Sequence, residues 1–343
     1  MKRMTYMIAA LLICLGASAQ EKRMAVVEFS TSYLRLQPDY ESPLETQELM
    51  GTVVEIVGEE GYWRQVVTPE PYTAWCTDLG LVEMSAEKIN EYKAAPKYIC
   101  TSHHSGVYAS PSVNARRLSD LSMGNLVRVV YKEGGKKQKI SRKGKWVEVM
   151  LPDGRKGWTP VTDLAHFAQW AGKQHITADR IVDTAMQFEG TPYLWGGASS
   201  KGLDCSGLVR LTFFNGHLLP RNASQQVNYG REVIMDCDHS IGSDSEKLHQ
   251  EMTKRIRNLQ PGDLVFFGTP GNMVRKERIT HVGIYIGNGK IIHASHKVRV
   301  NSLIPGQKDY YENSHKLLKA RRYIGWHGQG MLPVIQSPAY FLW

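Results

Sequence analysis

The sequence predicts a multidomain chain in which two small all-β domains precede a larger α+β domain. Its 343 residues exceed what one compact core usually holds. A tryptophan spacing occurs twice in the first half, and the second half begins with helical periodicity and ends with strand-like runs. At 42% hydrophobic and 22% charged residues, the composition is that of a globular protein.

The first nineteen residues have the layout of a secretory signal peptide. Lys2 and Arg3 precede an apolar run over residues 8–15, and Ala17-Ser18-Ala19 follows, so cleavage is expected just before Gln20. The run is too short to span a bilayer, and no later stretch reaches 18 uninterrupted apolar residues. We expect an exported, periplasmic or extracellular protein without a membrane span. Lipidation at Cys14 is disfavoured by the bulky Ile13 before it.

Residues 20–95 and 96–165 read as two copies of one β-rich domain. Trp63 and Trp75 are twelve residues apart, and so are Trp146 and Trp158. Each copy has short alternating strands, and Pro152-Asp153-Gly154 marks a tight turn. The stretch over residues 146–158 resembles bacterial SH3-like domains, which are common in cell-wall enzymes. Two small SH3-like barrels are therefore expected.

Charge is distributed unevenly along the chain. Residues 20–95 carry 6 Lys and Arg against 14 Asp and Glu, a balance of −8, whereas residues 96–165 carry 13 against 5, a balance of +8. Residues 166–343 carry 21 against 14, a balance of +7. This pattern predicts either electrostatic packing between the parts or an acidic rim that attracts a cationic ligand. Nucleic acid is not an expected partner, because no binding motif or aromatic stacking array accompanies the basic residues.

Residues 166–343 are predicted to form an α+β domain. Thr177 is a plausible N-cap of a helix that ends before Gly190 and Pro192. A glycine-rich loop over residues 195–202 leads into a second helix, which begins near Cys205. Strand-like runs follow at residues 263–267, 281–286 and 290–294.

Cys205 stands where a cysteine can act as a nucleophile. A thiol attacks as thiolate, and a helix N-terminus or a nearby histidine lowers its pKa. Asp204 can cap the helix, and the glycine-rich loop can offer N–H groups to a substrate carbonyl. His281 starts a strand whose other positions are apolar, so its imidazole can project toward the cysteine. Cys76, Cys100 and Cys237 lack this context and are expected to be structural.

Four ordered blocks resemble the NlpC family of bacterial cell-wall cysteine peptidases, which are papain-like in fold. They are YLWGGASSKGLDCSGLV at residues 193–209, LPRNASQQ at 219–226, LQPGDLVFF at 259–267 and THVGIYIGNGKIIHAS at 280–295. The resemblance covers residues 176–323. It implies that Cys205 is the nucleophile, that His281 is the general base, and that His293 orients His281. It also implies murein stem peptides as substrates, cleaved between γ-D-glutamate and a diamino acid, with no cofactor.

Members with SH3-like domains ahead of the peptidase include a group that selects peptides with a free N-terminal L-alanine. By that resemblance Tyr72 of the first SH3-like domain reads the amine, and Glu45 is a weaker candidate. Other residues match substrate-pocket positions of the family: Tyr193, Asp204, Ser206 and Ser224. Asp204 could pair with the amine or only cap its helix. One departure is Asn222, where the family often has Asp.

Further expectations concern geometry and assembly. A regular hairpin about Asn288-Gly289 would place His281 and His293 on opposite faces, so an irregular hairpin is predicted. The insertion over residues 232–258 is expected to be a solvated loop without a metal site, since its acidic and histidine residues fail the calcium-loop pattern. We expect a monomer. The alternative is a wall-binding protein whose third domain is an inactive peptidase, an amidase or an acyltransferase.

Overall fold

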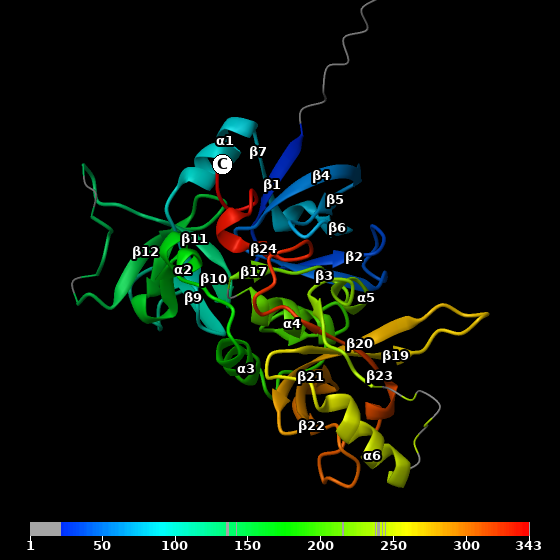
Figure 1. The fold of residues 1–343 in the computed structure, drawn as a ribbon. Helices are drawn as coiled ribbons and strands as arrows, with labels where there is room; N and C mark the ends of the chain where they lie inside the picture. The colour runs from blue at the N-terminus through cyan, green and yellow to red at the C-terminus, as the bar shows by residue number, and fades with distance from the viewer. Residues whose placement is uncertain are drawn as a thin grey trace, which may run out of the picture.

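The structure is a computed structural model that describes residues 22–134, 137–141, 143–214, 216–236, 238, 241, 243 and 245–342 (Figure 1). The predicted signal peptide at residues 1–19 and Cys237 lie outside the described residues. No helix within the described ranges is long and apolar enough to cross a membrane.

The first domain is an antiparallel sheet in the order β3-β2-β6-β5-β4-β1-β7. Its strands are β1 (Arg23–Val27), β2 (Thr31–Arg35), β3 (Leu44–Leu49), β4 (Val53–Glu60), β5 (Trp63–Val67), β6 (Thr73–Thr77) and β7 (Leu81–Met84), with the 3-10 helix η1 (Asp78–Gly80) before the last. One face buries an apolar cluster that includes Val27, Leu34, Val54 and Val66. The sheet is SH3-like, and its strand order is open rather than closed into a barrel.

The second domain repeats this topology after the linking helix α1 (Ala86–Ala94), in the order β10-β9-β13-β12-β11-β8-β14. Its elements are β8 (Lys97–Cys100), β9 (His104–Tyr108), β10 (Arg117–Ser122), β11 (Leu126–Val129), β12 (Trp146–Met150), β13 (Lys156–Pro160), η2 (Val161–Asp163) and β14 (Leu164–His166). The matching strand orders agree with the duplicated tryptophan spacing. Boundaries at residues 95 and 165 stay predictions.

The third domain packs helices against one antiparallel sheet in the order β18-β23-β19-β20-β21-β22. The helices are α2 (Phe167–Gly172), α3 (Ala178–Met186), α4 (Cys205–Phe213), α5 (Ala223–Gln226) and α6 (Ser245–Ile256). The sheet strands are β18 (Arg231–Glu232), β19 (Leu264–Thr269), β20 (Arg278–Gly287), β21 (Lys290–Ser295), β22 (Lys297–Ser302) and β23 (Leu317–Arg322). Short elements complete it: β15 (Ala198–Ser199), β16 (Gly202–Leu203), β17 (His217–Leu218), β24 (Leu332–Pro333), η3 (Ser314–Lys316) and η4 (Val334–Gln336).

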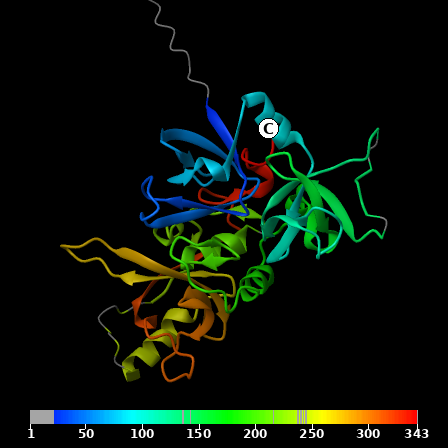
Figure 2. The same ribbon diagram turned by 180° about the vertical axis from the view of Figure 1, so that it is seen from behind.

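Helix α4 lies between the first domain and the six-stranded sheet in both views (Figures 1 and 2). Leu208 and Val209 of this helix are fully buried in one cluster with Val282 and Ile284 of β20. Burying four such side chains contributes on the order of 6 kcal/mol. Apolar packing therefore fixes the start of α4 against the middle of the sheet.

Residues 245–256 of the insertion over residues 232–258 form helix α6, so the prediction of a solvated loop was wrong for this part. Leu248 and Met252, one helical turn apart, are buried in α6. Arg255 is also fully buried, where it pairs with Glu251 and donates to the carbonyl oxygens of Asp238 and Leu317. One of these contacts comes from β23, whose Leu317 carbonyl oxygen accepts from Arg255, and the run of charged residues in the sequence gives no sign of them. His239 and Asp244 lie outside the described residues, and the described part of the chain holds no group of three or more metal-ligating side chains.

The carboxyl-terminal tail joins all three domains. Val334 and Tyr340 are buried in a cluster with Ile99 and Leu126 of the second domain and Phe214 of the third. The Tyr340 hydroxyl lies 3.4 Å from Thr52 Oγ1 in the first domain. The tail therefore packs at the domain junction as well as on the third domain.

Candidate active site

Cys205 is the first residue of α4, as predicted, and its thiol lies against β20. Asp204 caps the helix by accepting the Gly207 N–H at 2.7 Å. The backbone N–H of Val282, one residue after His281, donates to the thiol. The capped start of α4 therefore lies against β20. The thiol of Cys205 contacts the backbone one residue away from His281, the predicted base.

Burial, rather than the helix N-terminus, controls the protonation of Cys205. The side chain is 9% exposed, and burial followed by the nearby Asp204 charge raises the pKa of the thiol to about 12. The N–H groups of Val282 and Ser206 and the Arg221 guanidinium oppose this rise. The predicted lowering of the Cys205 pKa was wrong, because local helix geometry is outweighed by desolvation in the folded domain.

His281 and His293 meet directly across the β20–β21 hairpin. Nε2 of His281 lies 2.7 Å from Nδ1 of His293, and the rings are nearly perpendicular. Ile284 pairs with Ile292 and Gly287 with Lys290, so Ile286 is an extra residue in β20. The irregular hairpin was correctly predicted, and the extra residue, Ile286, lies next to Gly287.

A chain of hydrogen bonds orders both imidazoles. Asn301 Nδ2 donates to the Asp309 carbonyl oxygen at 2.7 Å, which leaves Asn301 Oδ1 facing His293 Nε2 at 2.9 Å. Because Oδ1 only accepts, His293 carries its proton on Nε2 and presents Nδ1 as an acceptor. His281 must then donate from Nε2, and its Nδ1 is left free to accept a proton.

Both histidines are neutral in this environment. Burial, with the His293 and Arg299 charges, lowers the pKa of His281 to about 3. Burial lowers the pKa of His293 to about 4, although the hydrogen bond with Asn301 acts to raise it. The His281 imidazole is therefore neutral and able to act as a general base, and the thiol of Cys205 is protonated rather than part of a preformed ion pair.

Two tyrosines complete the surroundings of the thiol. Tyr193 and Tyr311 both have pKa values raised first by burial, and the charge of Cys205 contributes to each rise. The Tyr311 ring packs edge-on against His293, with ring centres 4.6 Å apart. Tyr193 was predicted from the sequence. Tyr311 was missed, because its ring partners Phe267, His281 and His293 are all distant in the sequence and give no local signal.

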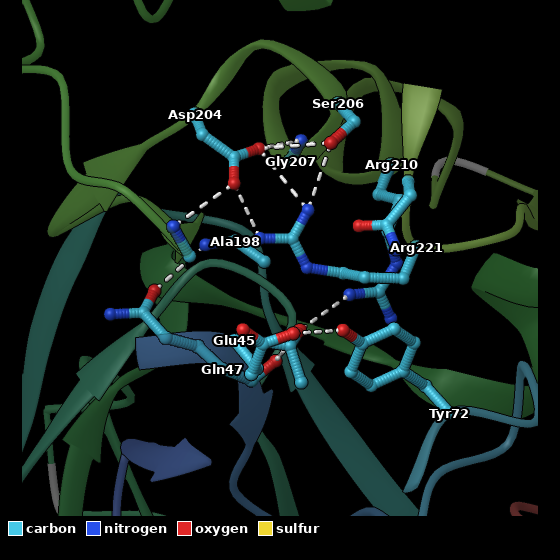
Figure 3. Close-up of polar contacts among 12 residues, drawn as sticks. Glu45, Gln47, Tyr72, Ala198, Asp204, Ser206, Gly207, Arg210 and Arg221 are labelled. Atoms are coloured by element: carbon cyan, nitrogen blue, oxygen red, sulfur yellow. Dashed lines mark hydrogen bonds and ion pairs between the residues drawn. The ribbon is translucent and has the colours of Figure 1, made fainter. Parts of the chain in front are cut away.

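Asp204 and Ser206 are held by Arg221 rather than open to a ligand (Figure 3). Arg221 is 2% exposed and pairs with both carboxylate oxygens of Asp204, while its Nη1 also donates to Ser206 Oγ at 2.9 Å. Gly196 N–H donates to the second Asp204 oxygen at 3.1 Å. Of the two roles left open for Asp204, capping is realised, and its charge is balanced by Arg221. Arg221 lies in the block at residues 219–226, but the sequence alone gives no indication of this role.

The glycine-rich loop does not offer free N–H groups at the positions expected. Gly196 donates to Asp204, Gly197 donates to the Leu194 carbonyl at 2.9 Å, and Ala198 donates to Gln47 Oε1 of the first domain at 2.8 Å. The expectation that this stretch of the loop supplies an oxyanion hole was wrong. Two of the three acceptors come from the N-cap Asp204 and from Gln47 of β3, which the composition of the loop does not reveal.

Tyr72 and Glu45 of the first domain reach this site (Figure 3). The Tyr72 hydroxyl donates to Glu45 Oε2. Asn222 and Arg221 both act on the pKa of Tyr72, which burial and Glu45 raise. Within the described ranges, Glu45 has no cationic partner. By contrast, Ser224 is exposed on α5 and contributes only its carbonyl oxygen, to Asn228.

Comparisons with known proteins agree with this geometry. Residues 190–318 match the NlpC/P60 family. The chain is 29% identical over 293 residues to a gamma-D-glutamyl-L-lysine dipeptidyl-peptidase of Bacillus cereus, covering 82% of this chain and 75% of the relative. It is 26% identical over 286 residues to dipeptidyl-peptidase 6 of Lysinibacillus sphaericus, covering 81% of this chain and 91% of the relative.

A solved structure shows the same fold. The crystal structure of an NlpC/P60 family protein from Bacillus cereus superposes with a TM-score of 0.67 at 22% identity, covering 88% of this chain and 99% of that one. Residues 190–318 therefore form a domain of the NlpC/P60 family, which is a family of cysteine peptidases.

Proposed function

We propose that this protein is an exported hydrolase of cell-wall peptides that cleaves short stem peptides after γ-D-glutamate and requires their free amino terminus. The observation that carries the proposal is the thiol of Cys205 at the backbone N–H of Val282, next to His281, whose imidazole is hydrogen-bonded to His293. The names of the relatives support the bond, since two of them are gamma-D-glutamyl-L-lysine dipeptidyl-peptidases. The leader-like residues 1–19 support export.

Catalysis begins with general-base activation of the thiol. His281 Nδ1 accepts the proton of Cys205 as the sulfur attacks the γ-carbonyl carbon of D-glutamate. His293 accepts a hydrogen bond from His281 Nε2 and stabilises the imidazolium, because Asn301 holds its acceptor atom in place. The tetrahedral oxyanion then needs donors, for which the N–H at the start of α4 and the Tyr193 hydroxyl are suited.

Collapse of this intermediate breaks the peptide bond. The imidazolium of His281 gives its proton to the departing amine of the diamino acid, and the acyl group remains on Cys205 as a thioester. A water molecule then attacks the thioester while His281 again accepts a proton. The products are the L-alanyl-D-glutamate dipeptide and the shortened diamino peptide, and the thiol is regenerated without a cofactor.

Glu45 is the residue best suited to the free amine. Asp204 is already neutralised by Arg221, whereas Glu45 contacts only the neutral hydroxyl of Tyr72 among the described residues. An α-ammonium group would therefore gain a charge-assisted hydrogen bond from Glu45, with Tyr72 orienting the carboxylate. We therefore propose Glu45, ahead of Tyr72 and Asp204, as the ligand of the amine.

The test uses defined peptides and product mass spectrometry. Purified protein is incubated with L-Ala-γ-D-Glu-L-Lys, with the meso-diaminopimelate peptide and with their N-acetylated forms. We expect dipeptide release from the free peptides and little from the acetylated ones. No release from any peptide would contradict the peptidase proposal, while equal release from both forms would remove only the amine requirement.

A further inference from the structure

A buried charge cluster joins the nucleophile helix to the first domain. Arg210 lies on α4, five residues after Cys205. Its Nη2 pairs with Glu70 and lies 3.4 Å from Glu48 Oε1, and its Nη1 lies 3.3 Å from Thr46 Oγ1. The three ionisable side chains are only 11% (Arg210), 5% (Glu48) and 7% (Glu70) exposed. Such a cluster is costly to break from one side.

The two acids belong to the segments that carry the proposed amine pocket. Glu48 follows Glu45 by three residues in β3, and Glu70 precedes Tyr72 by two residues in the loop before β6. These segments are otherwise separate, since β3 and β6 are not neighbours in the sheet. One guanidinium therefore holds both segments, and the Tyr72 to Glu45 hydrogen bond closes the connection.

Contact with both segments requires a cation that has more than one donor group. Glu70 Oε2 is buried without a hydrogen-bond partner within the described ranges, so Arg210 is the contact that neutralises this acid there. Burial and the Glu70 charge raise the pKa of Glu48 to about 8. At neutral pH, Glu48 is therefore largely protonated, and the charge pair is that between Arg210 and Glu70. A lysine has no planar fork to reach both segments.

We infer that Arg210 is a specificity-positioning residue, which holds the segments of Glu45 and Tyr72 in register with Cys205 without touching substrate. This inference rests on the proposed function. It predicts that weakening the cluster costs recognition of the free amine more than it costs chemistry at the thiol. A merely structural ion pair would lower stability and leave selectivity unchanged.

The experiment compares the free peptide with its N-acetylated form in variants of the full mature chain. Arg210→Lys keeps the charge and loses the fork, and Glu70→Gln releases the Tyr72 segment while Arg210 remains. Lys201→Met is the matched control. It removes another contact between domains, in which Lys201 Nζ pairs with Asp120 and donates to Ser30 Oγ at 2.6 Å, and none of these residues lies in β3. The readouts are kcat and KM for both peptides, the alkylation rate of Cys205, and the melting temperature.

We expect the ratio of kcat/KM for free over acetylated peptide to fall about five- to tenfold in Arg210→Lys and Glu70→Gln, mainly through KM. The alkylation rate should stay within about twofold, and Lys201→Met should keep the wild-type ratio. An unchanged ratio in folded Arg210→Lys and Glu70→Gln, or an equal fall in Lys201→Met, overturns the inference. A wild-type enzyme that cleaves both peptides equally removes the amine pocket and this inference together.

Discussion

Nε2 of His281 lies 2.7 Å from Nδ1 of His293, although a regular hairpin would place the two side chains on opposite faces of the sheet. One extra residue in β20, Ile286, shifts the register of the hairpin by one. The side chains of β20 that precede it therefore point to the opposite face from the one that regular pairing would give them. Gly287, with φ of 97°, accommodates the bulge next to the Asn288-Gly289 turn. The pairing of the two imidazoles is therefore a property of the hairpin's irregularity.

Asn301 should matter to catalysis because it fixes the proton on His293. We expect Asn301→Leu to lower kcat about tenfold or more with little change in KM, since the acceptor atom for His281 is no longer specified. Asn301→Asp keeps an acceptor and should retain more activity. Steady-state kinetics of both variants, with exposed Asn228→Ala as control, provide the measurement. Equal kcat in Asn301→Leu and wild type would refute the relay.

The pKa values predict how Cys205 reacts with an alkylating agent. With the thiol pKa raised to about 12 and the His281 pKa lowered to about 3, the thiolate fraction at neutral pH is small and grows with pH. The iodoacetamide rate constant should rise about tenfold per pH unit from pH 6 to 9 without levelling. Cys205→Ala supplies the background. A plateau already reached by pH 6 would indicate a thiolate–imidazolium pair instead.

Glu45 should govern recognition of the amino terminus. Glu45→Gln removes the carboxylate that lacks a cationic partner, so KM for the free peptide should rise about ten- to a hundredfold. The acetylated peptide, which carries no ammonium group, should be affected little. Glu41→Gln, an exposed acid of the same domain, is the control. If both peptides lose activity equally, Glu45 supports the fold rather than the amine.

Glu48 gives the folded protein a pH dependence of stability with a defined sign. Its pKa is about 8 in the folded state and 4.5 ordinarily, so the folded chain binds more protons between these values. The stabilisation is complete below pH 4.5 and is lost as pH rises through 8. Across that window it amounts to a few kcal/mol as an order of magnitude.

Urea unfolding of wild type and Glu48→Gln between pH 5 and 8.5 measures the contribution of Glu48 together with the charges of Glu70 and Arg210 that are coupled to it. The difference in free energy of unfolding should shift in favour of the variant as pH rises. A pH-independent difference would show that Glu48 keeps an ordinary pKa in the cluster.

The sequence predicted the features that short motifs determine. The cap at Asp204, the helix start at Cys205 and the helix cap at Thr177 depend on neighbouring residues alone. The need for an irregular hairpin followed from strand alternation between His281 and His293. The duplication of the SH3-like domain was visible in the tryptophan spacing, and the matching strand orders of the two sheets agree with it.

Features that depend on distant partners were not predictable in this way. The raised thiol pKa arises from burial of Cys205 in the folded domain. One N–H group of the glycine-rich loop is taken by Gln47, which lies 151 residues from Ala198. Helix α6 was missed because its buried Arg255 resembles a solvent-exposed charge in sequence. In each case the contact is made with residues distant in the sequence, which a local pattern does not indicate.

The central claim is that Cys205 forms a thioester with the dipeptide acyl group. Rapid acid quench of wild type with L-Ala-γ-D-Glu-diamino acid peptide, followed by intact-protein mass spectrometry, tests it most directly. The account predicts a transient mass increase equal to the L-alanyl-D-glutamyl group, located on the peptide that contains Cys205, and neither adduct nor dipeptide in Cys205→Ala. Dipeptide release by Cys205→Ala at the wild-type rate would contradict it.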